Sequence, residues 1–344
     1  MNYTNTNNTL KIVLSVGDES GIGPEIILKA LYSKEIPENI DITVVGSKKN
    51  LQNTFNHLKS LGLTNISDPK NLKIHDLEIS LSENKSKSSF GNSSFYYLTK
   101  AIEIVKQHPN SALVTGPICK KSWSLAGHYF SGQTEVLAKS CGVKNVGMLF
   151  TAKSPITGWR FNTLLATTHI ALCDVPKKLN AELIHSKLDL FKDFCTTYIA
   201  KPTFKVAGLN PHAGEDGILG NEEKDWLNDA LNSWSNKNRD IKLLGPLSPD
   251  SCWNSSAKAW RKQDAEKHDG ILAMYHDQGL IPMKVIAFNY SVNTTIGLPF
   301  IRTSPDHGTG FDIAGKGIAQ CQSMIEAIKA AIEITKNSRL LNTH

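Results

Sequence analysis

The sequence predicts an α/β fold in which a mostly parallel sheet carries helices on both faces. Short runs rich in β-branched residues alternate with longer amphipathic stretches along the whole chain, and this alternation is typical of parallel strands joined by helices. A chain of 344 residues buries roughly three-quarters of its unfolded surface, so its core needs neither disulfides nor a structural metal. The length allows two domains or one large domain. Because no segment in the middle has the composition of a linker, strands would have to cross between two lobes.

The individual elements follow from the spacing of the apolar residues. Six short apolar runs are expected to be strands: Lys11–Val16, Asp41–Gly46, Ala112–Thr115, Leu164–Thr167, Phe204–Leu209 and Ile271–Tyr275. Five longer stretches repeat their apolar residues at about 3.6 positions, the helical period: Glu25–Tyr32, Phe95–Gln107, Asn180–Tyr198, Glu222–Ser233 and Ser323–Lys336. Pro24 suits the first turn of its helix, where a missing N–H costs nothing. Ser80–Ser94 is rich in Ser, Lys and Asn and is expected to be a surface loop.

The composition is that of an ordinary globular protein. Lys and Arg number 38 against 32 Asp and Glu, a net charge of +6. The basic residues are dispersed, so an anionic small substrate explains the excess as well as nucleic acid does. No apolar run approaches the roughly 18 residues of a membrane helix, and no signal peptide is visible at the N-terminus. The six cysteines are scattered without a C-x-x-C pair, which favours reduced thiols and a cytoplasmic location.

Two glycine-rich strings are candidates for nucleotide-binding motifs. Gly17–Glu25 lies between a predicted strand and a predicted helix, where backbone N–H groups can receive an anion, although a tight turn is the plainer interpretation. The G-x-G-x-x-G fingerprint of dinucleotide-binding domains is nowhere in the chain. Gly310–Gly317 nearly matches a P-loop, but Gly317 stands where that motif needs Ser or Thr to hold Mg²⁺. A P-loop NTPase is therefore not predicted.

Three histidines follow predicted strands directly. His169, His212 and His276 each lie in a short polar string after an apolar run, and residues at the carboxyl ends of parallel strands meet at one edge of a sheet. Three imidazoles there can hold a divalent metal and leave a position open for substrate, with Glu215 and Asp277 orienting the rings. A single such histidine is more often a plain loop residue. Three at equivalent strand ends favour a shared site.

A cationic cluster follows His276. Lys284, Asn293 and Arg302 lie within one short stretch, and fixed cations with an amide donor suit a phosphate or carboxylate. The alternative is a solvated, charged face. Arg302 follows the apolar string LPFI, however, and a buried charge requires a partner.

Together these strings resemble one family, the 4-hydroxythreonine-4-phosphate dehydrogenases of pyridoxal phosphate biosynthesis. The matching segments span most of the chain in order: GDESGIGPE (17–25), VTGPICK (114–120), GQTE (132–135), ATTH (166–169), GLNPHAGE (208–215), YHDQGL (275–280) and GLPFIRTSPDHGT (297–309). The resemblance implies a two-lobed α/β/α subunit, similar to the isocitrate and isopropylmalate dehydrogenases, with a cleft between the lobes. It implies a discontinuous cofactor-binding lobe over residues 1–125 plus 295–344, and a metal, substrate and dimerisation lobe over residues 126–294.

The resemblance also implies roles for individual residues. It makes His169, His212 and His276 metal ligands that meet across a homodimer interface. The implied substrate-binding residues are Gln133, Thr134, Lys284, Asn293 and Arg302. The string from Asp306 to Gly317 resembles an adenosine-binding loop, with the following cofactor-binding residues: His307, Gly308, Asp312 and Gly315. Gln133 and Cys119 stand where many members of the family have His. Gln keeps a donor and an acceptor but cannot act as an acid near neutrality.

The activity implied is the oxidation of 4-phosphooxy-L-threonine at C3 by NAD or NADP, followed by decarboxylation to 3-amino-2-oxopropyl phosphate. A divalent metal would assist, with zinc expected first and magnesium or cobalt as alternatives. Asp250 and Lys284 are both candidates for the general base. One alternative is a related enzyme that oxidises D-threonate or D-erythronate 4-phosphate. A more remote one is a metal-dependent hydrolase. No nucleic-acid or membrane partner is expected.

Overall fold

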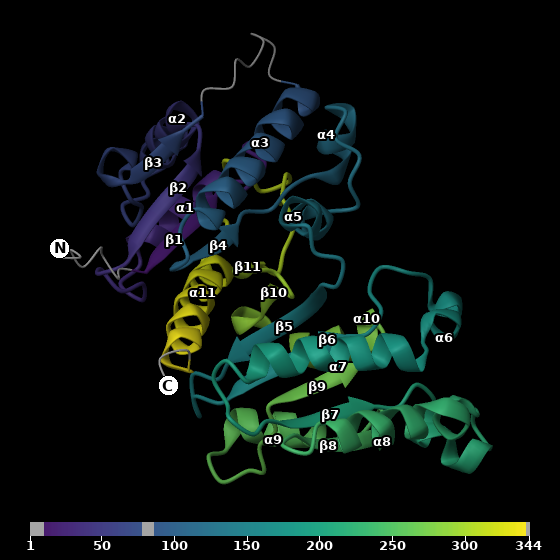
Figure 1. The fold of residues 1–344 in the computed structure, drawn as a ribbon. Helices are drawn as coiled ribbons and strands as arrows, with labels where there is room; N and C mark the ends of the chain where they lie inside the picture. Colours follow the sequence, from purple (N-terminus) through teal and green to yellow (C-terminus); the bar gives the residue numbers. More distant parts are fainter. Residues whose placement is uncertain (1–9, 78–85, 342–344) are drawn as a thin grey trace, which may run out of the picture. The chain divides into compact units, whose positions relative to one another are not determined.

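The chain folds into two compact units in a computed structural model that describes residues 10–77 and 86–341. Unit 1 comprises Met1–Lys144 with Leu298–Arg339, and unit 2 comprises Asn145–Gly297 with Leu340–His344. Each unit combines strands with helices (Figure 1). The predicted α/β class is therefore confirmed.

Unit 1 contains a parallel set of strands in the order β3-β2-β1-β4-β11. The strands are β1 (Lys11–Ser15), β2 (Asp41–Gly46), β3 (Lys73–Asp76), β4 (Ser111–Thr115) and β11 (Ile301–Pro305). The helices are α1 (Gly23–Tyr32), α2 (Lys48–Ser60), α3 (Lys87–Lys106), α4 (Lys120–Leu125), α5 (Gln133–Cys141) and α11 (Gln322–Leu341). β4 is buried along its whole length, because its small and β-branched side chains face packed layers on both sides.

Unit 2 is a mixed set of strands in the order β10-β5-β6-β9-β7-β8, with β10–β5 and β5–β6 antiparallel. The strands are β5 (Gly147–Lys153), β6 (Arg160–Leu165), β7 (Thr203–Ala207), β8 (Lys242–Leu247), β9 (Gly270–Ala273) and β10 (Val292–Ile296). The helices are α6 (Val175–Lys178), α7 (Ala181–Cys195), α8 (Asn228–Lys237), α9 (Asn254–Arg261) and α10 (His276–Ala287). Five short helical turns complete the two units: η1 (Pro69–Asn71), η2 (Leu172–Asp174), η3 (Pro211–Gly217), η4 (Glu223–Leu227) and η5 (Phe288–Tyr290). An aromatic core around Trp159, Phe161 and Trp260 supports unit 2.

The predicted loop at Ser80–Ser94 is wrong over its second half. Residues 80–85 lie outside the described part of the chain, but α3 already begins at Lys87. Ser86 caps it, because its side chain and that of Ser89 each accept from the other residue's backbone N–H. Ser93 and Ser94 are fully buried, and the Trp123 indole donates to the Ser94 hydroxyl at 2.9 Å. Their polarity therefore reflects a close helix contact with α4.

The lobe boundaries differ from those expected. The expectation placed residues 126–144 in the substrate lobe, whereas they belong to unit 1 together with α5. Residues 295–297, expected in the cofactor lobe, belong to unit 2. The reason is that α5 packs against α3, while residues 295–297 continue the strand paired with β5.

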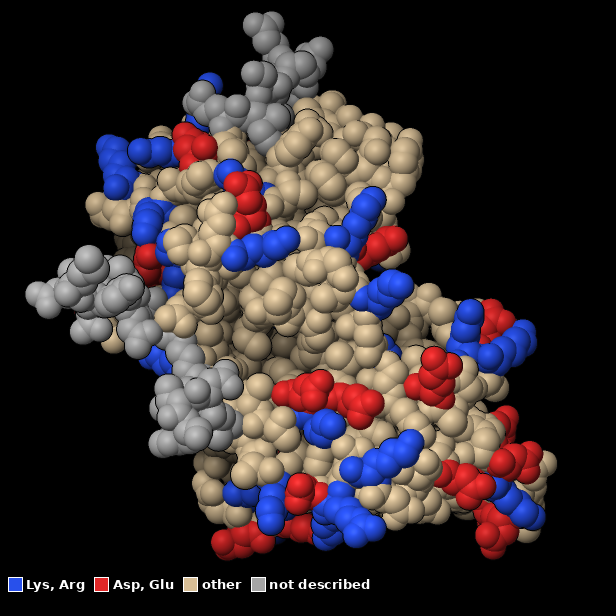
Figure 2. All heavy atoms as spheres, in the orientation of Figure 1, with Lys and Arg blue, Asp and Glu red and all other residues tan. Residues whose placement is uncertain are grey.

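The surface carries mixed charge. On the face drawn in Figure 2, Lys and Arg side chains are interspersed with Asp and Glu rather than gathered into one basic block. Among the helices of the described residues, none is long and apolar enough to cross a membrane.

Candidate active site

Two of the three predicted imidazoles lie together in unit 2. His169 follows β6 and His276 follows β9, and these strands run parallel with Leu165 beside Ala273. The strand ends therefore deliver both rings to one edge, where their centroids are 5.4 Å apart. His276 Nδ1 lies 2.7 Å from Asp277 Oδ1, which leaves Nε2 as the nitrogen available to a ligand.

The third imidazole, His212, lies on the turn that follows β7. Its side chain is 63% exposed, and its Nδ1 is 3.5 Å from Glu215 Oε2. Within residues 10–77 and 86–341, no group of three or more His, Cys, Asp or Glu side chains is arranged to hold a metal ion. A single chain therefore presents a pair of imidazoles and a separate third one.

The His212 turn has an unusual backbone and a buried carboxylate beneath it. Residues 212–216 all have positive φ, between 44° and 85°. Glu223, on the π-helical turn η4, is 2% exposed. Its Oε1 accepts the backbone N–H groups of Leu209 at 2.7 Å and Asn210 at 2.8 Å. No sequence motif pointed to Glu223.

Asp250, a candidate base, lies on the loop after β8. The Ser248 hydroxyl donates to its carboxylate at 2.5 Å. This hydrogen bond lowers the pKa of Asp250, and the charge of His212 lowers it further by a smaller amount. A carboxylate with a lowered pKa is a weak proton acceptor.

Lys284, the other candidate base, lies on α10 eight residues after His276. Eight residues are slightly more than two helical turns, so both side chains project from one side of the helix. The Lys284 ammonium is 5.8 Å from the centroid of the Phe288 ring. Asn293 lies on β10, opposite Phe150 of β5. Lys284 is thus on the same helical face as one candidate metal ligand.

A second group of predicted residues meets in unit 1 around Arg302. This side chain is 3% exposed, and burial lowers the pKa of Arg302 to about 10, which leaves it cationic at neutrality. Its Nη2 donates to Thr115 Oγ1 at 2.7 Å and to Gln133 Oε1 at 3.3 Å. The Gln133 amide donates in turn to the Gly116 carbonyl at 3.0 Å. Thr134 is the next residue of α5, and the role of Thr115, inside the VTGPICK string, was not predicted.

The glycine string at 17–25 forms a tight strand-to-helix turn. Gly17 has φ of +81°, where a side chain would collide with the Pro117 carbonyl. Asp18 is fully buried and accepts from the Ser20 backbone and hydroxyl. The Tyr97 hydroxyl donates to Glu19 at 2.6 Å, and burial together with the charge of Glu19 raises the pKa of Tyr97. The turn is thus built around buried acidic side chains.

The predicted cofactor loop packs against this turn. The Ile22 N–H donates to the Thr309 carbonyl at 2.8 Å, and a Cβ on Gly21 would lie 2.5 Å from the same oxygen. Gly308 has no neighbouring atom within 4 Å of its would-be Cβ, and Asp312 and Gly315 are exposed. His307 Nε2 is buried without a hydrogen-bond partner among the described residues. An open glycine backbone beside an unsatisfied imidazole nitrogen fits a polar ligand such as a nucleotide.

A buried ion pair fixes the far end of that loop. Lys29 Nζ lies 2.7 Å from Glu25 Oε1, with the two side chains 14% and 2% exposed. The ammonium also donates to the carbonyls of Gly317 and Ala319, and Glu25 accepts the Ala319 N–H. Helix α1 therefore holds the end of the loop through both charges.

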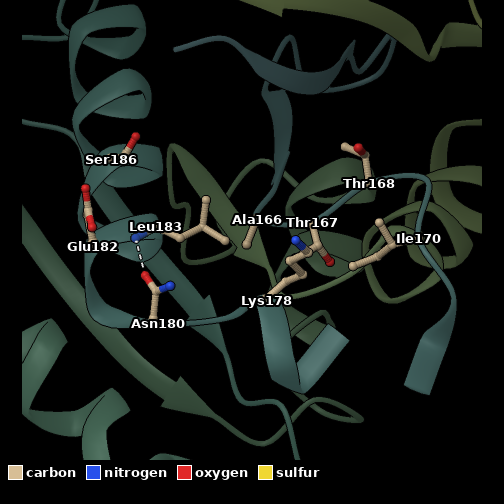
Figure 3. Close-up of a pocket in the computed structure, with 9 residues that line it drawn as sticks. All are labelled: Ala166, Thr167, Thr168, Ile170, Lys178, Asn180, Glu182, Leu183 and Ser186. Carbon is tan, nitrogen blue, oxygen red and sulfur yellow. Dashed lines mark hydrogen bonds between the residues drawn. The ribbon is translucent and has the colours of Figure 1, made fainter. Parts of the chain in front are cut away.

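A surface cavity of about 450 Å³ lies beside His169 in unit 2. Figure 3 shows its lining, in which the end of β6 faces the start of α7: Ala166, Thr167, Thr168, Ile170, Lys178, Asn180, Glu182, Leu183 and Ser186. Asn180 caps α7, because its Oδ1 accepts the Leu183 N–H at 2.9 Å. The cavity has space for a small polar molecule, and the two chain neighbours of His169, Thr168 and Ile170, are part of its lining.

Comparison with known proteins shows the family to which the chain belongs. The family model described as "Pyridoxal phosphate biosynthetic protein PdxA" matches residues 38–331. A Synechococcus sp. (strain RCC307) protein named 4-hydroxythreonine-4-phosphate dehydrogenase is 46% identical, and the match covers 94% of this chain and 99% of that protein. A Nostoc sp. protein of the same name is 47% identical over 94% of this chain and 92% of its own.

The fold has solved counterparts. A crystal structure of 4-hydroxythreonine-4-phosphate dehydrogenase from Klebsiella pneumoniae has a TM-score of 0.81 and 30% identity, covering 96% of this chain and 99% of that chain. A terephthalate 1,2-cis-dihydrodiol dehydrogenase from Burkholderia xenovorans has a TM-score of 0.60 and 23% identity, covering 94% and 98% of the two chains. The second shares the fold alone.

Proposed function

Because the chain belongs to the PdxA family of pyridoxal phosphate biosynthetic proteins, we propose that it oxidises 4-phosphooxy-L-threonine at C3. The oxidised acid then loses CO₂ to give 3-amino-2-oxopropyl phosphate, a step in pyridoxal 5′-phosphate biosynthesis. The observation that carries the proposal is the match over 94% of the chain to an enzyme named for this substrate. The site chemistry supports it, because the residues provide an anion-binding group and a pair of imidazoles.

Substrate binding falls to the cationic and amide groups. Arg302 is held by Thr115 and Gln133 and stays charged at neutrality, so it neutralises a phosphate or carboxylate. The remaining groups assigned to the substrate are Gln133, Thr134, Lys284 and Asn293. A fixed cation inside a buried network orients its ligand with little loss of entropy, because the side chain is already immobile.

His169, His212 and His276 would hold the metal, and neutral imidazoles suit zinc or cobalt better than magnesium. When bound, a divalent metal supplies a Lewis acid that lowers the pKa of a hydroxyl and polarises a carbonyl. The donor set fits this use: His169 and His276 are adjacent, and Asp277 fixes the ring of His276. The fit is incomplete within one chain, because His212 does not join the pair.

The residues His307, Gly308, Asp312 and Gly315 would hold the cofactor. When bound, NAD or NADP supplies a hydride acceptor. The support is the open glycine backbone and the unsatisfied His307 Nε2. Asp312 is exposed on this loop, and in this proposal its carboxylate accepts a hydrogen bond from a ribose hydroxyl.

We assign the proton transfer at the C3 hydroxyl to Lys284 rather than Asp250. Lys284 lies on α10, the helix that begins at His276 and so carries one of the two paired imidazoles. Asp250 is the weaker candidate because Ser248 and His212 lower its pKa. In this scheme Asp250 stays ionised and accepts the hydrogen bond from Ser248.

A second copy of the chain completes the site in this proposal. Helix α10 and the first residue of the turn η5 expose three apolar side chains at helical spacing: Ile281 at 63%, Val285 at 76% and Phe288 at 68%. Such a stripe on a soluble protein marks an interface, and a two-fold partner brings the same surface twice. The partner would supply the third imidazole. In this proposal the protein is a homodimer located in the cytoplasm.

The test is an assay of the purified protein with 4-phosphooxy-L-threonine, NAD or NADP, and Zn²⁺, Co²⁺ or Mg²⁺. NADH formation with release of CO₂ supports the proposal. Faster turnover of D-threonate or D-erythronate 4-phosphate would reassign the substrate. Phosphate release without NADH would indicate a metal hydrolase instead.

A further inference from the structure

The turn that carries His212 is held in a conformation that its own residues disfavour. Residues 212–216 have successive φ values of 52°, 55°, 85°, 44° and 56°, and only Gly214 among them lacks a Cβ. Left-handed backbone is unfavourable for residues with a Cβ, and a run of four such residues persists only where neighbours impose it. Some group outside the turn must therefore hold it.

The carboxylate of Glu223 lies at the base of this turn. Its Oε1 accepts the N–H groups of Leu209 and Asn210, and its Oε2 accepts Asn210 Nδ2 at 2.8 Å. These bonds fix the two residues that lead into the turn. Because charged hydrogen bonds in a buried setting are strong, the carboxylate clamps the chain where it leaves β7.

Two glycines make room for this carboxylate. A Cβ on Gly208 would lie 3.1 Å from Glu223 Oε1, and a Cβ on Gly214 would lie 2.9 Å from Oε2. Gly214 is inside the left-handed run, so the carboxylate contacts both the entry and the middle of the turn. Glu223 is itself the first residue of a π-helical turn, a rare form that is frequent at functional sites.

We propose that Glu223 is a positioning residue that sets the direction of the His212 imidazole by holding the left-handed turn. The inference rests on the proposed function, in which His212 is a metal ligand. Glu223 does not contact His212 and acts only through the backbone of residues 209–216. It is therefore distinct from Glu215, whose Oε2 lies 3.5 Å from the imidazole itself.

The adjacent Glu222 offers a matched control. Its Oε2 accepts Asn210 Nδ2 at 2.7 Å, so it shares the side-chain contact, whereas the two backbone N–H groups donate to Glu223. In Glu223→Gln the new amide N–H₂ group faces the Asn210 side-chain amide, which is also a donor, so that hydrogen bond is lost. The substitution also removes the negative charge, which weakens the hydrogen bonds from the backbone N–H groups of Leu209 and Asn210. Glu222→Gln makes the same chemical change one residue away.

The experiment measures metal binding and backbone exchange on the full-length protein and both variants. Titration of the metal-free chains with Co²⁺ alone is expected to show a Kd raised by about tenfold or more in Glu223→Gln, as for other groups that orient ligands, and by less than about twofold in Glu222→Gln. Amide hydrogen exchange of residues 209–216 is expected to become faster in Glu223→Gln alone. Thermal unfolding checks that both variants fold.

The outcomes separate this inference from the proposed function. If the wild-type chain does not bind Co²⁺, the metal assignment fails and the inference fails with it. If the wild type binds and Glu223→Gln binds equally well, only the inference is overturned. Should Glu223→Gln fail to fold, exchange in the wild-type chain decides: the Leu209 and Asn210 amides are expected to exchange as slowly as those of β7, and fast exchange overturns the clamp.

Discussion

At the scale of single residues, the candidate site depends on charges whose partners are specific. Arg302 is buried and donates through one nitrogen to Thr115 and Gln133. A lysine keeps the charge but loses the planar fork that serves several acceptors at once. The identity of the cation at this position therefore matters as much as its charge.

Arg302→Lys is expected to lower kcat/KM for the phosphorylated substrate by about tenfold to a hundredfold, since one hydrogen bond to a charged group contributes ~1.5–3 kcal/mol. Steady-state kinetics measure the change. Arg160→Lys on β6, where the arginine donates to Thr151 at 3.0 Å, is the matched control and should leave kcat/KM near wild type. Equal losses in both variants would show a general effect on folding.

His268 controls stability at low pH. It is 1% exposed, its Nε2 is 2.9 Å from the Ser256 hydroxyl, and burial lowers the pKa of His268 to about 3. The unfolded chain binds a proton below about pH 6.5 and the folded chain does not. The stabilisation is therefore complete above that pH and is lost as the pH falls toward 3.

His268→Asn is expected to reduce the free energy of unfolding at neutral pH by about 1–3 kcal/mol, because a buried hydrogen bond is altered. The deficit should shrink on acidification, by up to about 1.4 kcal/mol per pH unit below pH 6.5. Urea unfolding at several pH values measures both curves. A constant difference across the range would contradict the assignment.

At the scale of elements, strongly patterned segments were predictable and polar ones were not. The six predicted strands all correspond to strands of the structure, because short, continuous apolar runs such as that of β1 are typical of buried strands. The antiparallel strands β5 and β10 were missed, since Asn293 and Thr294 give β10 a weak strand signal. The start of α3 was missed because its small polar residues are buried against α4 by contacts that no sequence period reports.

The candidate site follows the same division. Strand ends placed His169 beside His276, as parallel pairing of β6 and β9 requires. The role of Glu223 could not be predicted, because a buried carboxylate that accepts backbone N–H groups has no sequence pattern of its own. Thr115 lay within a recognised string, but only the structure shows its bond to Arg302.

Helix α1 and the loop at 308–319 are joined by the Glu25–Lys29 pair. Lys29→Met is expected to lower the free energy of unfolding by about 3–5 kcal/mol, because it leaves the Glu25 carboxylate buried without its cation. Urea unfolding measures the loss. The exposed pair of Lys73 with Asp41 is the control, and Lys73→Met should cost no more than about 1 kcal/mol. Similar losses at the two positions would contradict a buried pair.

At the scale of the whole molecule, the proposed dimer predicts that two inactive variants can restore activity when they pair. A His169→Ala chain keeps its own His212, and a His212→Ala chain keeps its own His169 and His276. If each site draws His212 from the partner, a heterodimer of the two variants contains one intact site. Random pairing is then expected to restore about a quarter of the wild-type activity.

Co-expression of the two inactive variants followed by the NADH assay measures this recovery. His169→Ala with His276→Ala is the control, because those residues belong to the same half of the site and no pairing restores it. Activity in the control, or none in the test pair, would contradict a shared site. Light scattering of the wild type should give twice the mass of one chain.

The amide of Gln133 has a consequence for how the enzyme responds to acidity. Arg302, Thr115 and Gln133 hold no group that changes charge between about pH 5 and pH 9, given a pKa of Arg302 near 10. The anion-binding group of unit 1 is thus electrically constant across that range. Any bend in the pH–rate profile there must originate outside this group: in the substrate, in His307 of the cofactor loop, or in the histidines, carboxylates and lysine of unit 2. The profile therefore reports on ionising groups other than those that bind the anion.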